Sequence, residues 1–274
     1  MEKNKILFIG AGNMGSAIIK GLNQKTDFAN KIHFYEPEEN VRNVAAAKLK
    51  AIPIAEINEK IADFDTIVFA VKPQVFRNFP NDKSMANLAD FITEKQLVLS
   101  IMAGISIESI KGFLKEAKKV VRVMPNTPAL VGEAMSVLAP SEDVSAQDIE
   151  FAKEIFQSIG QVEVLQESSL DAVTGLSGSS PAFVMMFIEA LTQGGILCGL
   201  TKKTAEKLAV QTVFGSAKMA LETGTSVEEQ RHAVTSPGGT TIAGVAALEE
   251  NNFRSGVIKA VHAACVRSQE LGKS

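Results

Sequence analysis

The stretch Lys5-Ile-Leu-Phe-Ile9-Gly10-Ala-Gly12-Asn-Met-Gly15 decides the fold of this chain. Four consecutive strongly apolar residues before the first glycine predict a buried β-strand over Lys5–Ile9, and the apolar spacing of Asn13–Leu22 predicts a helix. A glycine pattern of this kind between a strand and a helix is typical of the first turn of a dinucleotide-binding βαβ unit. The alternative is a glycine-rich βα turn without a ligand.

Each glycine of this turn has a separate expected role. Gly10 permits the tight turn, Gly12 lets the backbone approach a pyrophosphate, and Gly15 allows the helix to pack closely on the strand. The helix start, with Asn13 and Met14, then offers free N–H groups and a positive dipole end to the phosphates. We therefore place the dinucleotide phosphates over Gly10–Gly15.

The first half of the chain alternates β-branched runs with amphipathic segments, which predicts a Rossmann-like α/β domain with a mainly parallel sheet. The expected helices after Asn13–Leu22 are Val41–Leu49 and Ile107–Glu116. The expected strands after Lys5–Ile9 are Lys31–Tyr35, Thr66–Val71, Leu97–Ile101, Val120–Met124, Met135–Ala139 and Val162–Leu165.

After about Gln166 the sequence predicts helices alone, so we expect a dinucleotide-binding domain over 1–166 and an all-α domain over 167–274. Pro181–Leu197 is apolar on every side, although Glu189 and Gln193 argue against a membrane span. A helix of this kind must be surrounded by protein. A second subunit is the expected cover, and the α/β domain is the alternative.

Composition narrows the classes of function. Of the 274 residues, 46% are hydrophobic and 22% charged, with a net charge of −3, which excludes wholesale disorder and argues against binding to nucleic acid or an anionic membrane. Cys198 and Cys265 lie in apolar stretches and are expected to be reduced and buried. Neither a signal-peptide core nor a cluster of metal ligands is recognisable, so we expect a cytoplasmic protein without a metal.

The end of the second predicted strand bears on cofactor choice. Glu36 lies 21 residues after Gly15, where an acid accepts hydrogen bonds from the adenosine ribose. Glu38 and Glu39 add charge that would repel a 2′-phosphate, and Arg42 is the one nearby cation that can receive it. NADH is therefore favoured over NADPH. The alternative is a solvated acidic helix start.

Four further motifs make a family resemblance specific. They are Ala70-Val-Lys-Pro-Gln74, Met124-Pro-Asn-Thr-Pro-Ala129, Leu176-Ser-Gly-Ser-Ser-Pro-Ala-Phe183 and Ser236-Pro-Gly-Gly-Thr-Thr241. In this order, with Gly10–Gly15, they make the chain resemble pyrroline-5-carboxylate reductase over its whole length. The resemblance implies a Rossmann domain, a helical domain that interlocks with another subunit in a homodimer or larger ring, and the last step of proline biosynthesis.

The resemblance places further segments beside the dinucleotide. They contain Ala70, Val71, Lys72, Pro73, Ala103, Asn126 and Thr127. Lys72 either reaches a phosphate or ribose or is a solvated lysine. Asn126 and Thr127 either donate to the nicotinamide or ribose or serve the turn between two prolines. Because Glu36-Pro-Glu38-Glu39 is more acidic than NADPH-preferring members usually show, the family's cofactor choice is not carried over.

The turn Ser236–Thr241 is the expected substrate site. Gly238 and Gly239 free the backbone, and Thr240 or Thr241 suits the N-cap of the next helix. Backbone N–H groups at Gly239 and Thr240 would hold the substrate carboxylate, and the Thr241 hydroxyl would hydrogen-bond the substrate nitrogen. Ser236 and Ser179 would support the pocket. The alternative for this turn, and for the helix entrance at Ser179, is helix capping alone.

The expected reaction is reduction of Δ1-pyrroline-5-carboxylate to L-proline. A cyclic imine can arrive protonated, so hydride adds without an enzyme acid of special pKa, which suits a chain with three scattered histidines. One alternative is a β-hydroxyacid dehydrogenase, whose Lys-x-x-x-Asn pattern is absent from the second half. Another is a non-catalytic dinucleotide sensor, which leaves the turn at Ser236–Thr241 without a purpose.

Overall fold

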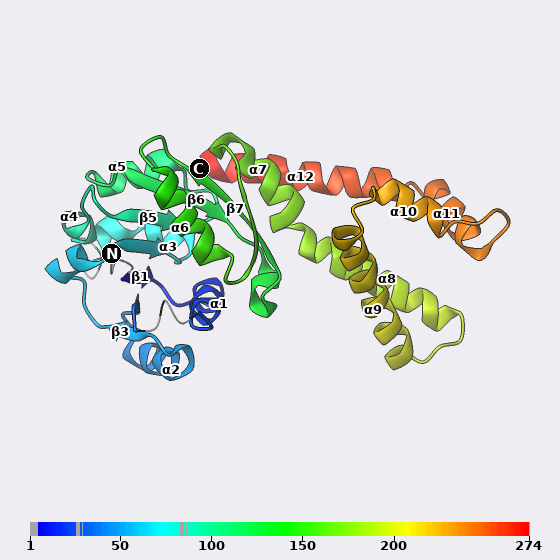
Figure 1. Cartoon of the computed structure of the whole chain (residues 1–274), viewed down its shortest axis with the longest axis horizontal. Helices are drawn as coiled ribbons and strands as arrows, with labels where there is room; N and C mark the ends of the chain where they lie inside the picture. The colour runs from blue at the N-terminus through cyan, green and yellow to red at the C-terminus, as the bar shows by residue number, and fades with distance from the viewer. Residues whose placement is uncertain (1–4, 26–27, 29, 83–84, 86, 274) are drawn as a thin grey trace. The chain divides into compact units, whose positions relative to one another are not determined.

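The computed structural model describes residues 5–25, 28, 30–82, 85 and 87–273. The chain divides into two compact units, of which the first contains Met1–Gly178 with Ala264–Ser274 and the second Ser179–Ala263 (Figure 1). The long helix α12 (Phe253–Lys273) contributes its last part to the first unit. The assignment of the cofactor to 1–166 and the substrate to 167–274 stays a prediction.

The first unit is built on an eight-stranded sheet in the order β3-β2-β1-β4-β5-β6-β7-β8. Neighbouring strands are parallel except for β6 and β7, which are antiparallel. The strands are β1 (Ile6–Ile9), β2 (Ile32–Tyr35), β3 (Ile52–Ile54), β4 (Thr66–Phe69), β5 (Leu97–Ser100), β6 (Lys119–Met124), β7 (Ala134–Pro140) and β8 (Gly160–Val164). The predicted Rossmann-like sheet is confirmed.

Helices cover both faces of this sheet, which is why its central strands are continuously apolar. From β1, Ile6 and Phe8 enter one core, and Leu7 and Ile9 enter the other. The first core is closed by α1 (Asn13–Leu22), α2 (Glu39–Leu49) and α6 (Ala146–Phe156). The second is closed by η2 (Glu59–Asp63), α3 (Pro73–Arg77), η3 (Phe79–Asn81), α4 (Leu88–Phe91) and α5 (Ile107–Leu114).

Strand β3 is the one strand that the sequence analysis missed. It has three residues, and Pro53 in its middle pairs with Phe34 of β2. Proline cannot donate to a ladder and is tolerated where one side of the strand is unpaired, which is the case at this edge of the sheet. Its shortness and its proline removed the usual signal for a strand.

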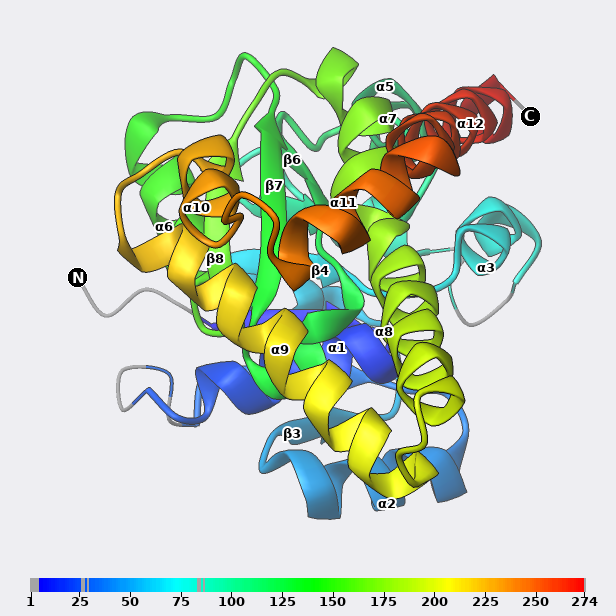
Figure 2. The ribbon, with the colours of Figure 1, turned by 90° about the vertical axis from the view of Figure 1, so that its right-hand side faces the viewer.

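The second unit is helical, as predicted, and contains α8 (Ser180–Leu197), α9 (Lys202–Glu222), α10 (Val227–Ala233), α11 (Thr240–Glu250) and the start of α12. Helices α8 and α9 form a hairpin (Figures 1 and 2). At their contact a Cβ on Gly195 would lie 3.0 Å from the Cβ of Ala205. The rings of Phe187 in α8 and Phe253 in α12 lie 5.7 Å apart.

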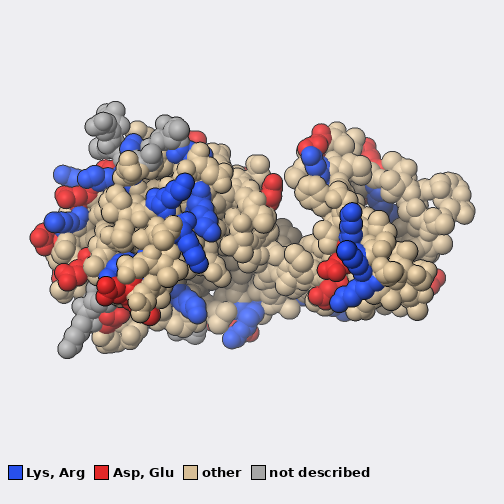
Figure 3. Space-filling view, turned by 90° about the horizontal axis from the view of Figure 1, so that it is seen from below, with Lys and Arg blue, Asp and Glu red and all other residues tan. Residues whose placement is uncertain are grey.

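Much of the apolar surface of the second unit is uncovered within one chain. Met186 is 68% exposed and Leu197 is 89% exposed, and wide uncharged areas separate the charged side chains in Figure 3. The helical stretch Glu167–Leu197 is long and apolar enough to cross a membrane. Only 6% of its most apolar window is buried within the chain, so most of this apolar surface has no cover from its own chain. Cys198 is exposed and Cys265 half-buried, so the expectation of two buried thiols is wrong for the single chain.

Candidate functional site

The segments assigned to the dinucleotide follow β1, β2, β4, β5 and β6. Because these five strands are mutually parallel, all of these segments lie at the same end of the sheet, where the carboxyl ends of the strands meet. The strand order reverses between β1 and β4, and ligands of open α/β sheets bind outside the carboxyl ends of the strands at such a reversal. Gly10–Gly15 and Ala70–Pro73 flank this point.

The glycine turn after β1 has the geometry that its expected roles require. Gly10 has a φ of +97°, which L side chains rarely adopt, and a Cβ there would lie 2.8 Å from Cγ1 of Val71. At Gly15 a Cβ would lie 2.9 Å from the carbonyl oxygen of Gly10 and 3.0 Å from the Cβ of Ala70. The absence of a side chain at Gly10 and Gly15 therefore lets α1 and the loop after β4 lie close to the turn.

Gly12 differs from these two glycines because, apart from its own atoms and those of its chain neighbours, no atom of the described residues lies within 4 Å of the position of its Cβ. It is the N-cap of α1, and no side chain caps that helix end. Gly12 and Asn13 are exposed and Met14 is half-buried, so the start of α1 offers open space beside its first N–H groups. These features fit a dinucleotide pyrophosphate.

The end of β2 holds Glu36 and Arg42 together. The Arg42 guanidinium donates from Nη1 to the carbonyl oxygens of Glu36 at 2.8 Å and Pro37 at 3.1 Å. Glu36 is half-buried, and its Oε1 accepts a 3.3 Å hydrogen bond from the N–H of Glu38. A carboxylate acceptor and a guanidinium cation are therefore neighbours at this strand end.

The remaining cofactor candidates differ in exposure. Lys72, Ala103 and Thr127 are exposed, whereas Ala70, Val71, Pro73 and Asn126 are half-buried. Lys72 is the N-cap residue of α3, and Pro73 is its first residue, so the proline begins a helix after the strand. Thr127 begins η4 (Thr127–Val131).

Asn126 uses both ends of its side-chain amide within the protein. Its Oδ1 accepts from the N–H of Met135 in β7 at 2.9 Å, and its Nδ2 donates to the carbonyl oxygen of Ser177 at 3.1 Å. The side chain therefore does not cap η4, whose N-cap residue it is. No periodicity or motif in the sequence indicates this link between residues 126 and 177.

The turn Ser236–Gly239 lies in the second unit. The N–H of Gly239 donates to the carbonyl of Ser236 at 3.1 Å, with Pro237 and Gly238 between them. Gly238 has a φ of +70°, and proline followed by such a glycine is typical of a type II turn. A Cβ at Gly239 would collide with Oγ of Ser236. The turn itself therefore requires a glycine at 238, and Gly239 leaves room for the Ser236 side chain.

The expected threonine cap after this turn is wrong. Gly239 is the N-cap of α11, and Thr240 and Thr241 are its first two residues, exposed and within the helix. No side-chain hydrogen bond caps this helix, so its first N–H groups lack that partner. Ser179 is the N-cap residue of α8 and likewise makes no side-chain capping bond. Capping by a side chain therefore explains neither helix entrance.

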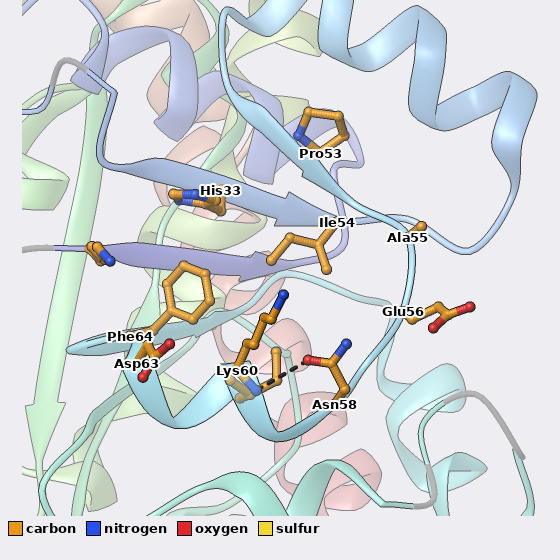
Figure 4. A pocket seen from close by; sticks show the side chains of 11 residues that line it. His33, Pro53, Ile54, Ala55, Glu56, Asn58, Lys60, Asp63 and Phe64 are labelled. Carbon is orange, nitrogen blue, oxygen red and sulfur yellow. Dashed lines mark hydrogen bonds between the residues drawn. The ribbon is translucent and has the colours of Figure 1, made fainter.

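A cavity of about 440 Å³ lies elsewhere on the first unit (Figure 4). It is lined by His33 of β2, by Ile54 of β3 and by the segment that leads to Phe64. The rings of His33 and Phe64 meet edge to face at 4.9 Å, and burial lowers the pKa of His33. None of the predicted site residues lines this cavity. Among the described residues no group of three His, Cys, Asp or Glu side chains gathers as metal ligands do.

Comparison with known proteins covers both units. Residues 5–104 match the family model "NADP oxidoreductase coenzyme F420-dependent", and residues 167–271 match "Pyrroline-5-carboxylate reductase dimerisation". A pyrroline-5-carboxylate reductase from Methanosarcina acetivorans is 43% identical over 275 residues, which cover 100% of both chains. The chain belongs to the pyrroline-5-carboxylate reductase family. The protein is therefore an oxidoreductase of the class that uses a nicotinamide dinucleotide.

Solved structures of other family members agree with this assignment. A pyrroline-5-carboxylate reductase from Coxiella burnetii has a TM-score of 0.91 and 35% identity, with 99% of this chain and 100% of that chain covered. The Plasmodium falciparum enzyme, solved with NADP bound, has a TM-score of 0.83 and 32% identity, with 99% of each chain covered. Family membership decides against a β-hydroxyacid dehydrogenase.

Proposed function

We propose that this protein reduces Δ1-pyrroline-5-carboxylate to L-proline with a nicotinamide dinucleotide. The observation that carries the proposal is the full-length relationship to pyrroline-5-carboxylate reductases, at 43% identity with no part of either chain left out. The fold supports it independently, because the predicted dinucleotide residues lie at the carboxyl ends of five parallel strands.

The residues at the carboxyl ends of these strands fit a dinucleotide. Gly12 leaves open space beside the uncapped start of α1, where a pyrophosphate would accept from backbone N–H groups. Glu36 would accept from the adenosine ribose, and the exposed Lys72 and Thr127 would face the rest of the dinucleotide. When bound, the reduced nicotinamide supplies the hydride.

The second unit would hold the imine. The uncapped first turn of α11 offers backbone N–H groups at Gly239 and Thr240 to the substrate carboxylate. The exposed Thr241 hydroxyl would hydrogen-bond the substrate nitrogen, while Ser236 and Ser179 would line the pocket. Because the imine can arrive protonated, these groups orient the ring and exclude water, and no side chain needs an altered pKa.

We further propose that NADH is preferred to NADPH. The half-buried carboxylate of Glu36 would repel a 2′-phosphate, and Glu38 and Glu39 add two exposed charges beside it. Arg42 offsets part of this repulsion, yet two backbone carbonyls already accept from its guanidinium. The expected outcome is a preference for NADH with measurable use of NADPH.

We also propose a cytoplasmic homodimer, or a larger ring of dimers. The match to a dimerisation family over residues 167–271 supports it, as does the exposed apolar surface of α8 and α9. A second copy of the chain would cover residues such as Met186 and Leu197, which one chain leaves 68% and 89% exposed. Neither a nucleic acid nor a membrane is an expected partner of a chain with a net charge of −3.

The experiment is a steady-state assay that follows oxidation of NADH and, separately, of NADPH after addition of Δ1-pyrroline-5-carboxylate. Sustained oxidation that depends on the imine supports the reductase, and the initial rates give the cofactor preference. Binding of the dinucleotide without turnover would instead support a non-catalytic sensor. Oxidation driven by a β-hydroxyacid but not by the imine would contradict the proposal.

A further inference from the structure

Two motifs that are distant in the sequence meet inside the first unit, at the junction where the chain leaves it. The segment Met124–Asn126 begins with the last residue of β6, and the segment Thr174–Gly178 directly precedes Ser179, the first residue of the second unit. Between them run the Asn126 Nδ2 hydrogen bond to the Ser177 carbonyl, at 3.1 Å, and a close contact of Met124 with Gly178.

The segment Thr174–Gly178 is a π-helix, η6, inserted between α7 (Leu170–Val173) and α8. Helices of this kind are rare, and short π-bulges are frequently found at functional sites. Two hydroxyls turn back onto the preceding turn, from Thr174 to the carbonyl of Leu170 at 2.8 Å and from Ser177 to that of Val173 at 3.1 Å. Such back-bonding bends helices.

Asn126 holds this π-helix from outside. Its Nδ2 donates a hydrogen bond to the carbonyl of Ser177. Its Oδ1 accepts a hydrogen bond from the N–H of Met135 at 2.9 Å, which ties the same amide to β7 of the sheet. A Cβ at Gly178 would lie 2.5 Å from Cε of Met124, the flexible end of that side chain, so the glycine leaves room for Met124 against the π-helix. The sheet is thus tied to the last turn before Ser179 through one amide.

We propose that Asn126 is a positioning residue for substrate: by tying the Ser177 carbonyl to the sheet, its amide sets where the chain enters α8 and presents Ser179. This inference rests on the proposed function, which places Ser179 in the substrate pocket. It differs from a direct dinucleotide contact of Asn126, because the role assigned here uses the two hydrogen bonds that the amide makes within the protein. It therefore predicts an effect on the imine without an effect on the dinucleotide.

Asn126→Asp is the decisive variant. It keeps an acceptor for the Met135 N–H and replaces the donor to Ser177 with a charged oxygen, so the tie to the π-helix is lost and the Ser177 carbonyl is repelled. We expect kcat/KM for Δ1-pyrroline-5-carboxylate to fall roughly tenfold, as expected for a small misplacement of a substrate-orienting group. The Kd of NADH, measured by fluorescence titration, should change by less than about twofold because the glycine turn is untouched.

Two further variants keep the proposal falsifiable. Gly178→Ala places a methyl group against Cε of Met124, the flexible end of that side chain, so a smaller loss confined to the imine is expected. Thr174→Val is the control, since it removes the hydrogen bond to Leu170 within the same π-helix and leaves the tie to Asn126. The control should keep the wild-type kcat/KM.

Several results would overturn the proposal. They are a tenfold weaker Kd for NADH in Asn126→Asp, an unchanged kcat/KM for the imine, and an equal loss in Thr174→Val. The wild-type rate tests the proposed function separately. Should the wild type fail to reduce the imine, hydrogen exchange over residues 174–180 still tests the tie, which requires faster exchange in Asn126→Asp than in wild type.

Discussion

At the scale of single residues, Glu36 carries the proposed cofactor preference. Replacing it with Ser removes the carboxylate and keeps the backbone carbonyl that accepts from Arg42. Losing a charge-assisted hydrogen bond of about 1.5–3 kcal/mol should weaken NADH, and the lost repulsion should favour NADPH. We expect the ratio of the two kcat/KM values to shift about tenfold or more toward NADPH.

The matched control for this prediction is Glu39→Ser, which removes the same charge from the exposed first residue of α2. Its effect on the ratio should be small, because surface charges are screened. Equal shifts in both variants would mean that net charge, and not a contact of Glu36, sets the preference.

Thr241 carries the prediction for the chemistry. Thr241→Ala removes one hydroxyl from the first turn of α11 and leaves the backbone N–H groups in place. Loss of one hydrogen bond to a charged group costs about 1.5–3 kcal/mol, so kcat/KM for the imine should fall roughly tenfold to a hundredfold. Because an orienting hydroxyl has no pKa near neutrality, the pH profile should keep its shape at lower height.

The control for Thr241 is Thr235→Val, which removes a hydroxyl that donates to the carbonyl of Arg231 at 2.6 Å in the preceding helix. This variant should retain the wild-type rate. A changed pH profile in Thr241→Ala would show that the hydroxyl transfers a proton, and an unchanged kcat/KM would remove Thr241 from the site.

Residue identities alone could predict the glycine turn but not the partners of Asn126. Gly10, Gly12 and Gly15 follow a pattern whose spacing reflects one local geometry. The partners of the Asn126 amide, Met135 and Ser177, depend on how β6, β7 and η6 pack, and the sequence carries no periodic signal for that. The threonine cap of α11 failed for a local reason, because Gly239 already occupies the N-cap position.

At the scale of elements, the prediction succeeded wherever periodicity was strong. The helix Asn13–Leu22 has the predicted bounds, and the seven predicted strands are present with ends shifted by a few residues. Strand β3 was missed because three residues around Pro53 carry no alternation. Helix α8 was predicted to need cover from protein, and the exposure of Met186 shows how little of that cover its own chain supplies.

Helix α8 provides the prediction for assembly. Met186 is 68% exposed in one chain, so Met186→Asp should leave the folded monomer intact. In a dimer the same change would bury an unpaired carboxylate. Its expected cost is roughly 3–5 kcal/mol, as for breaking a buried ion pair. We expect analytical ultracentrifugation to show a shift from dimer toward monomer with loss of activity, while Met186→Leu stays dimeric. A dimeric, fully active Met186→Asp would place the interface elsewhere.

At the scale of the whole molecule, the proposed cofactor and substrate sites lie in different units. The first unit presents the ends of five parallel strands, and the second presents a glycine-rich turn and uncapped helix starts. The full-length relationship to pyrroline-5-carboxylate reductases joins these two sites in one reaction. Composition and periodicity could predict the two folds, whereas the reaction came from the motifs.

The most direct test of the reductase is to follow the hydride itself. The protein is supplied with Δ1-pyrroline-5-carboxylate and NADH carrying deuterium at the transferable position of nicotinamide C4, and the product is examined by mass spectrometry and NMR. The account predicts L-proline with one deuterium at ring carbon C5 for each dinucleotide oxidised. Oxidation of the dinucleotide without deuterium in proline, or no proline at all, would contradict it.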